Sequence, residues 1–461
     1  MKYKIIAIFL IMVISCMACS HTKEAVKTSD IHQGMEQAPP ISAKNISKDF
    51  MQLVADGKYK ETQKYFDNNM KNACPPLKLK QIWESILARF GDFGRITDTR
   101  TAVAGNIQIS FVTCVFNKMV VDFRVPFNAS KEIVGFFVES ARPITDVPAV
   151  QLETSDFFFE KAVTIGSGEW SLPGILTIPR GNGDFPAVIL VHGSGPGDRD
   201  ETIGPNKPFR DLAHGLRDKG IAVLRYDKRT KVYGIKMALS ANGLTVKEET
   251  IDDALAAVDL LRRTDNIDKN RIYVLGHSLG GYLVPRIGKQ DPGIAGFIIM
   301  AGSTRPLEDL VCEQVEYIAS LDGNLSETDK KNLASLKMQA AKVKESNLSV
   351  DTPAMELPLG VPASYWLDLR GYRPAKMAKK LSQPLLILQG GRDYQVTKVD
   401  YNIWKENLSS NRHVQIKLYE KLNHFFIEGE GMSTPSEYNV PGHVARVVID
   451  DIADWIKDSH K

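Results

Sequence analysis

Gly276-His277-Ser278-Leu279-Gly280 is the stretch of sequence that decides the fold. It follows a short apolar run at residues 271–275 that is typical of a buried strand, and an apolar helical pattern begins at Leu279. A serine between two glycines at a strand–turn–helix junction is the pattern of a nucleophile elbow, because the glycines allow the tight turn. We therefore predict that Ser278 is a catalytic nucleophile; the alternative is a glycine-rich turn with an incidental serine.

Short apolar runs alternate with helical patterns on both sides of this elbow. The sequence predicts buried strands at residues 186–191, 221–226, 294–300, 384–390 and 414–419, and helices at residues 209–219, 247–263 and 279–289. Residues 157–165 and 171–178 alternate around Gly166-Ser167-Gly168, which predicts an antiparallel hairpin at the sheet edge. Strands that alternate with helices are typical of an α/β fold with a mainly parallel sheet.

One connection is too long for a simple crossover, since about eighty residues separate the strand that ends near Ala301 from the strand at residues 384–390. Helical patterns at residues 308–319 and 327–344, followed by several prolines, predict a helical cap inserted at about residues 303–380. Tyr365 and Trp366 in this insertion are candidates for a substrate pocket, and packing inside the cap is their alternative role.

A serine hydroxyl needs a base that removes its proton, so a histidine must reach Ser278. His424 is the best candidate among the nine histidines, because it closely follows the predicted strand at residues 414–419. The alternatives are His413, at the start of that strand, and His443, which we expect to open the final helix. Both are expected to be surface or capping residues.

The third member of such a site is a carboxylate that orients the histidine. Asp393 meets this requirement, because Gly390-Gly391-Arg392-Asp393 directly follows a predicted buried strand. Asp400, deeper in the next helix, is the alternative carboxylate, and a solvated turn is the alternative role of Asp393. The chain order serine, aspartate, histidine is the order expected after a nucleophile elbow.

Two backbone N–H groups are needed to stabilise the oxyanion that forms when the serine attacks. One comes from Leu279, the residue after the nucleophile. We expect the second from Ser194 in the loop His192-Gly193-Ser194-Gly195, with Gly195 as the alternative. We expect His192 to brace this loop and His277 to pack beside the serine.

Residues 42–142 have a different pattern and are predicted to form a small α+β domain. Apolar residues at helical spacing over residues 45–90 are followed by strand patterns at 107–116 and 119–126. Tyr65-Phe66-Asp67, Trp83 and Phe90-Gly91-Asp92-Phe93 resemble accessory domains with nuclear-transport-factor-like or cystatin-like folds. No acid, base and nucleophile stand together in this sequence, so we expect a structural or recognition role. A proline-containing linker follows at residues 142–148.

The start of the chain reads as an export signal. Lys2 and Lys4 precede an uncharged apolar run at residues 5–14, which is too short to span a bilayer comfortably. Val13-Ile14-Ser15-Cys16 resembles a bacterial lipoprotein box, so we predict a signal over residues 1–19, lipidation of Cys16 and a flexible tether over residues 20–41. Cys19 is a second candidate for lipidation, and ordinary secretion is the alternative. We therefore expect an exported protein at the membrane surface.

Charge and cysteine content exclude several classes of function. Lys and Arg (58) nearly balance Asp and Glu (55) in the 461 residues, so no charged field calls for nucleic acid. Apart from Cys16 and Cys19, the five cysteines leave Cys74, Cys114 and Cys312, which lack the paired spacing of a zinc site. We expect buried free thiols, no metal and a small-molecule substrate, with the membrane contacted through the lipid only.

From about residue 153 to its end, the chain resembles the bacterial α/β-hydrolases that include dienelactone-hydrolase-like and cinnamoyl-esterase-like enzymes. The landmarks of this resemblance are the elbow together with His192-Gly193, Tyr226-Asp227-Lys228-Arg229, the segment from Gly390 to Asp393, and Asn423-His424. The resemblance implies a triad of Ser278, Asp393 and His424, and hydrolysis of acyl esters without a cofactor. Asp198-Arg199-Asp200-Glu201 also resembles a loop near the site, although solvated salt bridges explain it equally well.

The same fold also carries other functions. A serine peptidase needs a fixed charge that holds a peptide terminus, for which Arg305 or Arg373 in the cap are candidates. A thioesterase and a non-catalytic binding protein are further alternatives, but an intact triad in the correct order disfavours the binding protein. A serine carboxylesterase is therefore the function that we expect.

Overall fold

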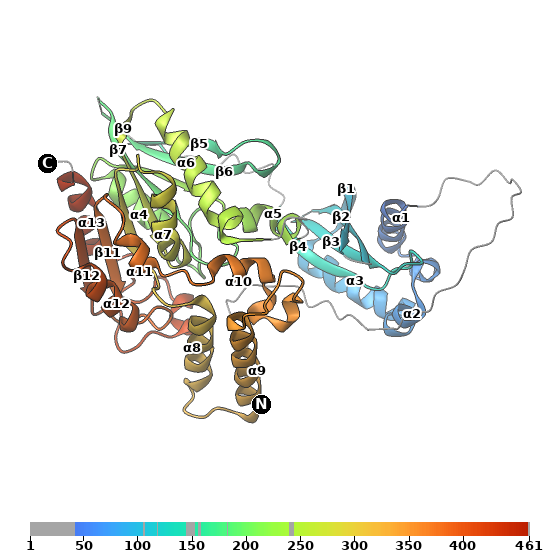
Figure 1. Cartoon of the computed structure of the whole chain (residues 1–461). Coiled ribbons are helices and arrows are strands. Elements are labelled where there is room, and N and C mark those ends of the chain that lie inside the picture. Colours follow the sequence, from blue (N-terminus) through green and yellow to red (C-terminus); the bar gives the residue numbers. More distant parts are fainter. Residues whose placement is uncertain are drawn as a thin grey trace, which may run out of the picture. The chain divides into compact units, whose positions relative to one another are not determined.

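The computed structural model describes residues 42–104, 107–117, 119–143, 153–154, 158–181, 183–238 and 244–459 (Figure 1). Within these residues the chain forms two compact units, one that ends at residue 143 and one that begins at residue 153. Each unit has its own hydrophobic core. The predicted leader, its tether and the linker after residue 143 lie outside the described residues.

The smaller unit packs helices onto one face of a four-stranded antiparallel sheet, as the sequence predicts. Its strands pair in the order β1-β2-β3-β4. Trp83 lies at the centre of the core, where its ring contacts Phe93, Phe116 and Phe123 of the sheet. The elements are α1 Ala43–Ala55, η1 Glu61–Tyr65, α2 Asn68–Ala73, α3 Pro76–Phe90, β1 Phe93–Ala104, β2 Ile107–Phe116, β3 Met119–Phe127 and β4 Phe137–Pro143.

The larger unit is built on an eight-stranded sheet in the order β12-β11-β10-β9-β7-β8-β6-β5. β6 runs antiparallel to both of its neighbours, whereas the pairs from β8 to β12 are parallel. The predicted edge hairpin is confirmed, because β5 pairs only with β6 in this sheet. The strands are β5 Phe158–Ile165, β6 Leu172–Pro179, β7 Phe185–Val191, β8 Ala222–Tyr226, β9 Ile267–His277, β10 Gly296–Met300, β11 Leu385–Gly390 and β12 Val414–Tyr419.

Helices cover both faces of this sheet (Figure 1). Alternate residues of β7 face opposite sides: Val188 and Leu190 pack with α4 and α13, and Ile189 packs with α6 and α7. The helices outside the cap are α4 Pro208–Arg217, α5 Arg229–Ala238, the π-helical turn η3 Lys247–Ile251, α6 Asp252–Arg262, α7 Leu279–Gln290, α12 Lys398–Leu408 and α13 Arg446–Asp458, with 3-10 turns η2 Gly168–Trp170 and η6 Pro435–Asn439.

Full burial explains why the central strands read as mainly apolar runs in the sequence. Every residue of β8, β10 and β11 is buried. A parallel sheet with helices on both faces leaves no side of these strands for solvent, so an alternating pattern is not required. The predicted α/β class of this unit is confirmed.

The carboxyl ends of the parallel strands place the functional loops at one edge of the sheet. β7 pairs with β8 on one side and with β9 on the other, so the strand order reverses there. Ligands bind in the crevice outside the carboxyl ends of strands at such a reversal. The loops that follow β7, β9, β11 and β12 meet at this edge, and each carries one predicted site residue.

The long connection between β10 and β11 contains helices, as the sequence predicts. They are α8 Leu307–Ser320, α9 Glu327–Lys344, α10 Ala363–Leu369 and α11 Pro374–Ala378, with 3-10 turns η4 Ala354–Glu356 and η5 Pro358–Gly360. β10 and β11 are direct neighbours, with Phe297 opposite Leu385. The insertion therefore leaves the sheet and returns to it at adjacent strands.

Candidate active site

Ser278 occupies a tight turn between β9 and α7, in the strand–turn–helix setting that the elbow requires. Its φ of 53° is in the left-handed region, which costs a residue with a side chain about 1–3 kcal/mol. A Cβ on Gly276 would lie 2.4 Å from the Gly280 carbonyl carbon, and one on Gly280 would lie 2.3 Å from the Val191 oxygen. Both flanking glycines are thus needed for the turn to pack.

The first turn of α7 gives this serine a favourable electrostatic setting. The Ser278 N–H donates to the Met300 carbonyl at 2.9 Å, which fixes the turn to the end of β10. Leu279 is the first residue of α7, so its N–H has no acceptor within the helix and lies at the positive end of the helix dipole. This N–H is therefore available to an anion that forms at Ser278.

Asp393 and His424 meet as the sequence predicts. Asp393 Oδ2 lies 2.7 Å from His424 Nδ1, and both residues are buried, with 1% and 2% of their surfaces exposed. They come from the loops after β11 and β12. With its proton on Nδ1, the imidazole keeps Nε2 free to act as a base.

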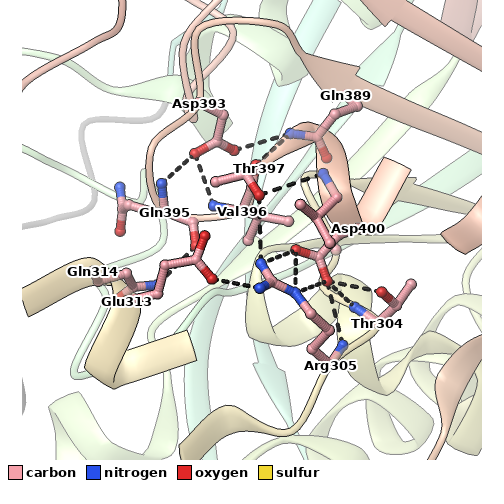
Figure 2. A network of polar contacts seen from close by, with 12 residues as sticks. Thr304, Arg305, Glu313, Gln314, Gln389, Asp393, Gln395, Val396, Thr397 and Asp400 are labelled. Atoms are coloured by element: carbon pink, nitrogen blue, oxygen red, sulfur yellow. Dashed lines mark hydrogen bonds and ion pairs between the residues drawn. The ribbon is translucent and has the colours of Figure 1, made fainter. Parts of the chain in front are cut away.

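Backbone and side-chain donors hold the Asp393 carboxylate in place, as Figure 2 shows. Oδ1 accepts hydrogen bonds from the backbone N–H groups of Gln395, at 2.8 Å, and Val396, at 3.0 Å. Oδ2, which faces His424, also accepts from the Gln389 side chain at 3.2 Å. These bonds fix the direction from which the carboxylate meets the histidine.

His424 lies beside the elbow. The ring centroids of His277 and His424 are 4.7 Å apart, and His277 Nε2 is 3.0 Å from the His424 carbonyl oxygen. His277 therefore packs beside Ser278 and fixes the backbone of His424. The structure thus joins Asp393 to His424 and places His424 against His277, the residue that precedes Ser278.

The alternative residues have other partners. The Asp400 carboxylate is buried and accepts from the Thr304 N–H at 2.7 Å and from Arg305 Nη2 at 2.8 Å. His413 is exposed, and His443 is an exposed partner of Asp211. The expectation that His443 opens the final helix is wrong, because α13 begins at Arg446.

The cap is connected to the Asp393 loop through α8 (Figure 2). Arg305 forms ion pairs with Asp400 and with Glu313 of α8, and Gln314 donates to the Gln395 carbonyl at 3.0 Å. Arg305 is thus already paired, which argues against its use for holding a peptide terminus. The first helix of the cap instead braces the loop that carries the carboxylate.

The loop after β7 lies against the elbow. Val191 is opposite Gly276 in the sheet, and a Cβ on Gly193 would lie 3.0 Å from the Ser278 Cβ. Because the Gly193 N–H donates to Glu201 Oε1 at 2.8 Å, it is not free for an oxyanion. The N–H of Ser194 therefore remains the first candidate for the second donor, and the N–H of Gly195 remains the alternative.

Glu201 belongs to a segment that the sequence places near the site, but its partner could not be predicted. Its Oε2 lies 2.9 Å from His277 Nδ1, and its side chain is 11% exposed, so the solvated salt bridge proposed for this loop is wrong for Glu201. Burial disfavours the charged imidazole, but the Glu201 carboxylate outweighs this effect and raises the pKa of His277. Burial likewise opposes ionisation of Glu201, whose pKa His277 nevertheless lowers. The sequence offered no signal for this burial.

His192 braces its own loop, as expected. Its Nε2 lies 2.9 Å from the Asp198 carbonyl oxygen, and its ring packs against Phe209 and Tyr226. Burial is the largest influence on its pKa and lowers it, so the ring is neutral near neutral pH. His192 therefore supports the loop as a neutral ring.

Tyr365 and Trp366 are buried side chains of the cap helix α10. The Tyr365 hydroxyl donates to Glu249 Oε2 at 2.7 Å, and Trp366 Nε1 donates to the Val361 carbonyl at 3.2 Å. Burial and the Glu249 charge raise the pKa of Tyr365 well above its usual range. Trp366 also lines a cap cavity of about 310 Å³ that includes Glu308 and Arg373. A substrate role for these two aromatic residues stays a prediction.

Cys74, Cys114 and Cys312 are buried free thiols, as the sequence predicts. Within the described part of the chain, no group of three or more His, Cys, Asp or Glu side chains could hold a metal ion. Among the residues that the structure describes, no helix combines the length and apolar character needed to span a bilayer. Cys16 and Cys19, the candidates for lipidation, lie outside these residues.

Two family models match separate parts of the chain. Residues 187–430 match the family described as serine aminopeptidase, S33, and residues 47–136 match a family of unknown function, DUF3887. The second match falls within the predicted accessory domain, and the first spans the elbow, Asp393 and His424.

Similarity to a named esterase extends over most of the chain. The esterase EstD of Thermotoga maritima is 39% identical over 407 residues, which cover 88% of this chain and 93% of that protein. Among solved structures, Est1E of Butyrivibrio proteoclasticus is 16% identical with a TM-score of 0.41, covering 65% of this chain and 98% of its own. The Pyrococcus furiosus esterase Pf2001 is 18% identical with a TM-score of 0.42, covering 66% and 92%.

Proposed function

This chain belongs to the serine aminopeptidase S33 family of α/β-hydrolases and is a serine esterase, and we propose that its acyl-enzyme forms on Ser278. The observation that carries the proposal is the buried 2.7 Å contact between Asp393 and His424 beside an elbow serine with positive φ. This arrangement supplies a nucleophile, a base and a group that orients the base.

The reaction follows from the positions of these groups. The Ser278 hydroxyl oxygen attacks the ester carbonyl carbon while His424 Nε2 takes its proton, and Asp393 stabilises the resulting imidazolium. The N–H groups of Leu279 and Ser194 stabilise the negative oxygen of the tetrahedral intermediate. His424 then gives the proton to the leaving alcohol. A water molecule, activated in the same way, hydrolyses the acyl-enzyme and restores Ser278.

Carboxylic esters are the expected substrates, and aminoacyl amides are the contrasting class. Arg305 is paired with Asp400 and Glu313 and so provides no free charge for a peptide terminus. The test compares p-nitrophenyl esters and aryl esters with aminoacyl p-nitroanilides on the purified full chain. We expect turnover of the esters; faster turnover of the anilides would identify a peptidase instead.

We also propose that residues 153–461 form the catalytic part and that residues 42–142 form an accessory domain. The support is that each described unit has its own core, and that all proposed site residues lie in the larger one. A chain that begins at Val150 should therefore fold and keep its kcat/KM on a short aryl ester. Circular dichroism establishes folding, and a folded truncated chain without ester turnover would contradict this division.

We further propose that the protein is exported and anchored to a membrane by lipid on Cys16. The basic start, the apolar run at residues 5–14 and the sequence Val13-Ile14-Ser15-Cys16 support this proposal. The wild-type protein should partition with membranes, and Cys16→Ala should remain in the soluble fraction of the exported protein. An unmodified mature terminus near Cys19 or beyond, found by mass spectrometry, would contradict lipidation of Cys16.

A further inference from the structure

Lys228 is a buried lysine in the loop between β8 and α5 that the mechanism above does not use. Only 2% of its surface is exposed. Its Nζ donates to the Gly193 carbonyl at 2.8 Å and lies 2.6 Å from Glu249 Oε1. Glu249 is also buried, and its other carboxylate oxygen accepts from the Tyr365 hydroxyl of the cap helix α10. A chain of contacts thus runs from the cap, through two buried charges, to the loop beside Ser278.

Stability alone does not account for this arrangement. Removing two charges from water costs several kcal/mol for each ion, and apolar replacements of a buried ion pair are often neutral or stabilising. The two charges of this pair come from different parts of the chain, and the ammonium contacts a single carbonyl of the loop. The role of the pair therefore lies in its effect on the Gly193 carbonyl.

The Gly193 carbonyl and the Ser194 N–H belong to the same peptide group. This group is trans, so the carbonyl and the N–H point in opposite directions across one plane. An ammonium fixed on the oxygen therefore fixes the direction of the N–H on the other side. It also withdraws electron density from the peptide group, because hydrogen bonds polarise one another, and this makes the N–H a stronger donor.

Further hydrogen bonds and an ion pair hold the loop at residues 193–199 in place. The Gly193 N–H donates to Glu201, so both peptide groups of this glycine are bonded. The backbone N–H of Lys228 donates to the Gly197 carbonyl at 3.0 Å, and Asp227 binds the Arg199 side chain through both carboxylate oxygens. Residues 227 and 228 thus dock onto the loop at residues 193–199 and carry Lys228 Nζ to its acceptor.

We propose that Lys228 is a positioning residue for the oxyanion hole, because its ammonium orients and polarises the Gly193–Ser194 peptide so that the Ser194 N–H is ready for the negative oxygen. Glu249, which accepts a hydrogen bond from Tyr365, holds this buried ammonium in place. The inference rests on the proposed function, in which the Ser194 N–H stabilises the tetrahedral intermediate. It extends that function by assigning a role to a side chain that touches neither substrate nor the reacting atoms.

The test compares Lys228→Met with wild type on a p-nitrophenyl ester and on a trifluoromethyl ketone. That ketone forms a tetrahedral adduct whose oxygen occupies the same hole. We expect kcat to fall by about 10- to 100-fold with KM unchanged, less than the ~100- to 1,000-fold loss for a whole donor. Affinity for the ketone should fall by a similar factor, because the adduct and the transition state carry the same charge. A merely structural role would not make these two changes parallel.

Lys247→Met is the matched control. Lys247 lies on η3, the same helical turn as Glu249, but it is half-exposed and pairs with Asp252. It should leave kcat and ketone affinity at wild-type values. If Lys228→Met does not fold, Lys228→Met combined with Glu249→Gln removes both buried charges, and the same losses are expected of it.

Two results would overturn the inference. One is a folded variant with wild-type kcat and ketone affinity, and the other is a raised KM with unchanged kcat, which would assign Lys228 to substrate binding. Ser278→Ala, measured in the same series, separates these results from a failure of the proposed function. If Ser278→Ala retains turnover, the proposed nucleophile is wrong; if it is inactive while Lys228→Met matches wild type, only the role of Lys228 is wrong.

Discussion

Ser278→Ala is expected to lower kcat for ester hydrolysis by about four to six orders of magnitude, because without the hydroxyl no acyl-enzyme can form. The oxyanion donors of Leu279 and Ser194 are backbone groups that the substitution does not remove, so a small residual rate above that of water is expected. The measurement is kcat on a p-nitrophenyl ester, together with covalent labelling by a fluorophosphonate. Labelling should disappear along with turnover.

An exposed serine provides the control for this experiment. Ser320→Ala, at the end of the cap helix α8, removes a hydroxyl that bonds only locally to the Tyr317 carbonyl. Its turnover and labelling should match those of wild type. If Ser278→Ala is folded and a fluorophosphonate still labels another serine, Ser278 is not the nucleophile.

His424→Ala is expected to reduce kcat nearly as much as the serine substitution does. The serine hydroxyl is a weak nucleophile unless a base takes its proton, so nucleophile and base act as one unit. For the same reason, adding Ser278→Ala to this variant should cause little further loss. The measurement is kcat for both single variants and the double variant; fully additive losses would show that the two residues act independently.

Two other histidines provide matched controls. His413 is exposed next to β12, and His443 is an exposed surface partner of Asp211. His413→Ala and His443→Ala should both keep kcat near the wild-type value. If either variant loses more activity than His424→Ala, the base has been assigned to the wrong histidine.

The site could be predicted from the sequence wherever a residue's role depends on its local pattern. Ser278 sits in a glycine-flanked turn after an apolar run, and only a strand–turn–helix junction fits those residues. Asp393 and His424 each follow a buried strand, and carboxyl ends of parallel strands meet at one edge of the sheet. Asp393 and His424 follow two adjacent parallel strands, which explains why they meet at 2.7 Å.

The partners of these residues could not be predicted, because burial of a charge has no local pattern. Lys228 pairs with Glu249, and His277 pairs with Glu201, across long separations in the sequence. The sequence places Lys228, Glu201 and His277 near the site, but nothing in it indicates which partners they bind. Only the folded chain shows that they meet away from water.

In the cap, the long helices could be predicted from the sequence, whereas the short helices could not. α8 and α9 are long enough for their apolar spacing to be recognised, whereas α10 and α11 are short and lie in a proline-rich stretch. Contacts with α7 hold the region of these short helices: Arg286 binds Asp368, and the Tyr372 hydroxyl donates to the Tyr282 carbonyl. Helices that depend on such tertiary contacts have a weak signal in the sequence.

The cap leaves the sheet at the carboxyl end of β10 and returns at the amino end of β11, which is the neighbouring parallel strand, so the sheet itself fixes both attachment points. The hydrolytic framework therefore does not depend on the length of what lies between them. Evolution or protein engineering could therefore replace the insertion as one unit. A replacement would have to keep the contacts that the cap makes with Asp400 and Glu249. Substrate range can then diverge between descendants of one enzyme while the chemistry at Ser278 is inherited intact.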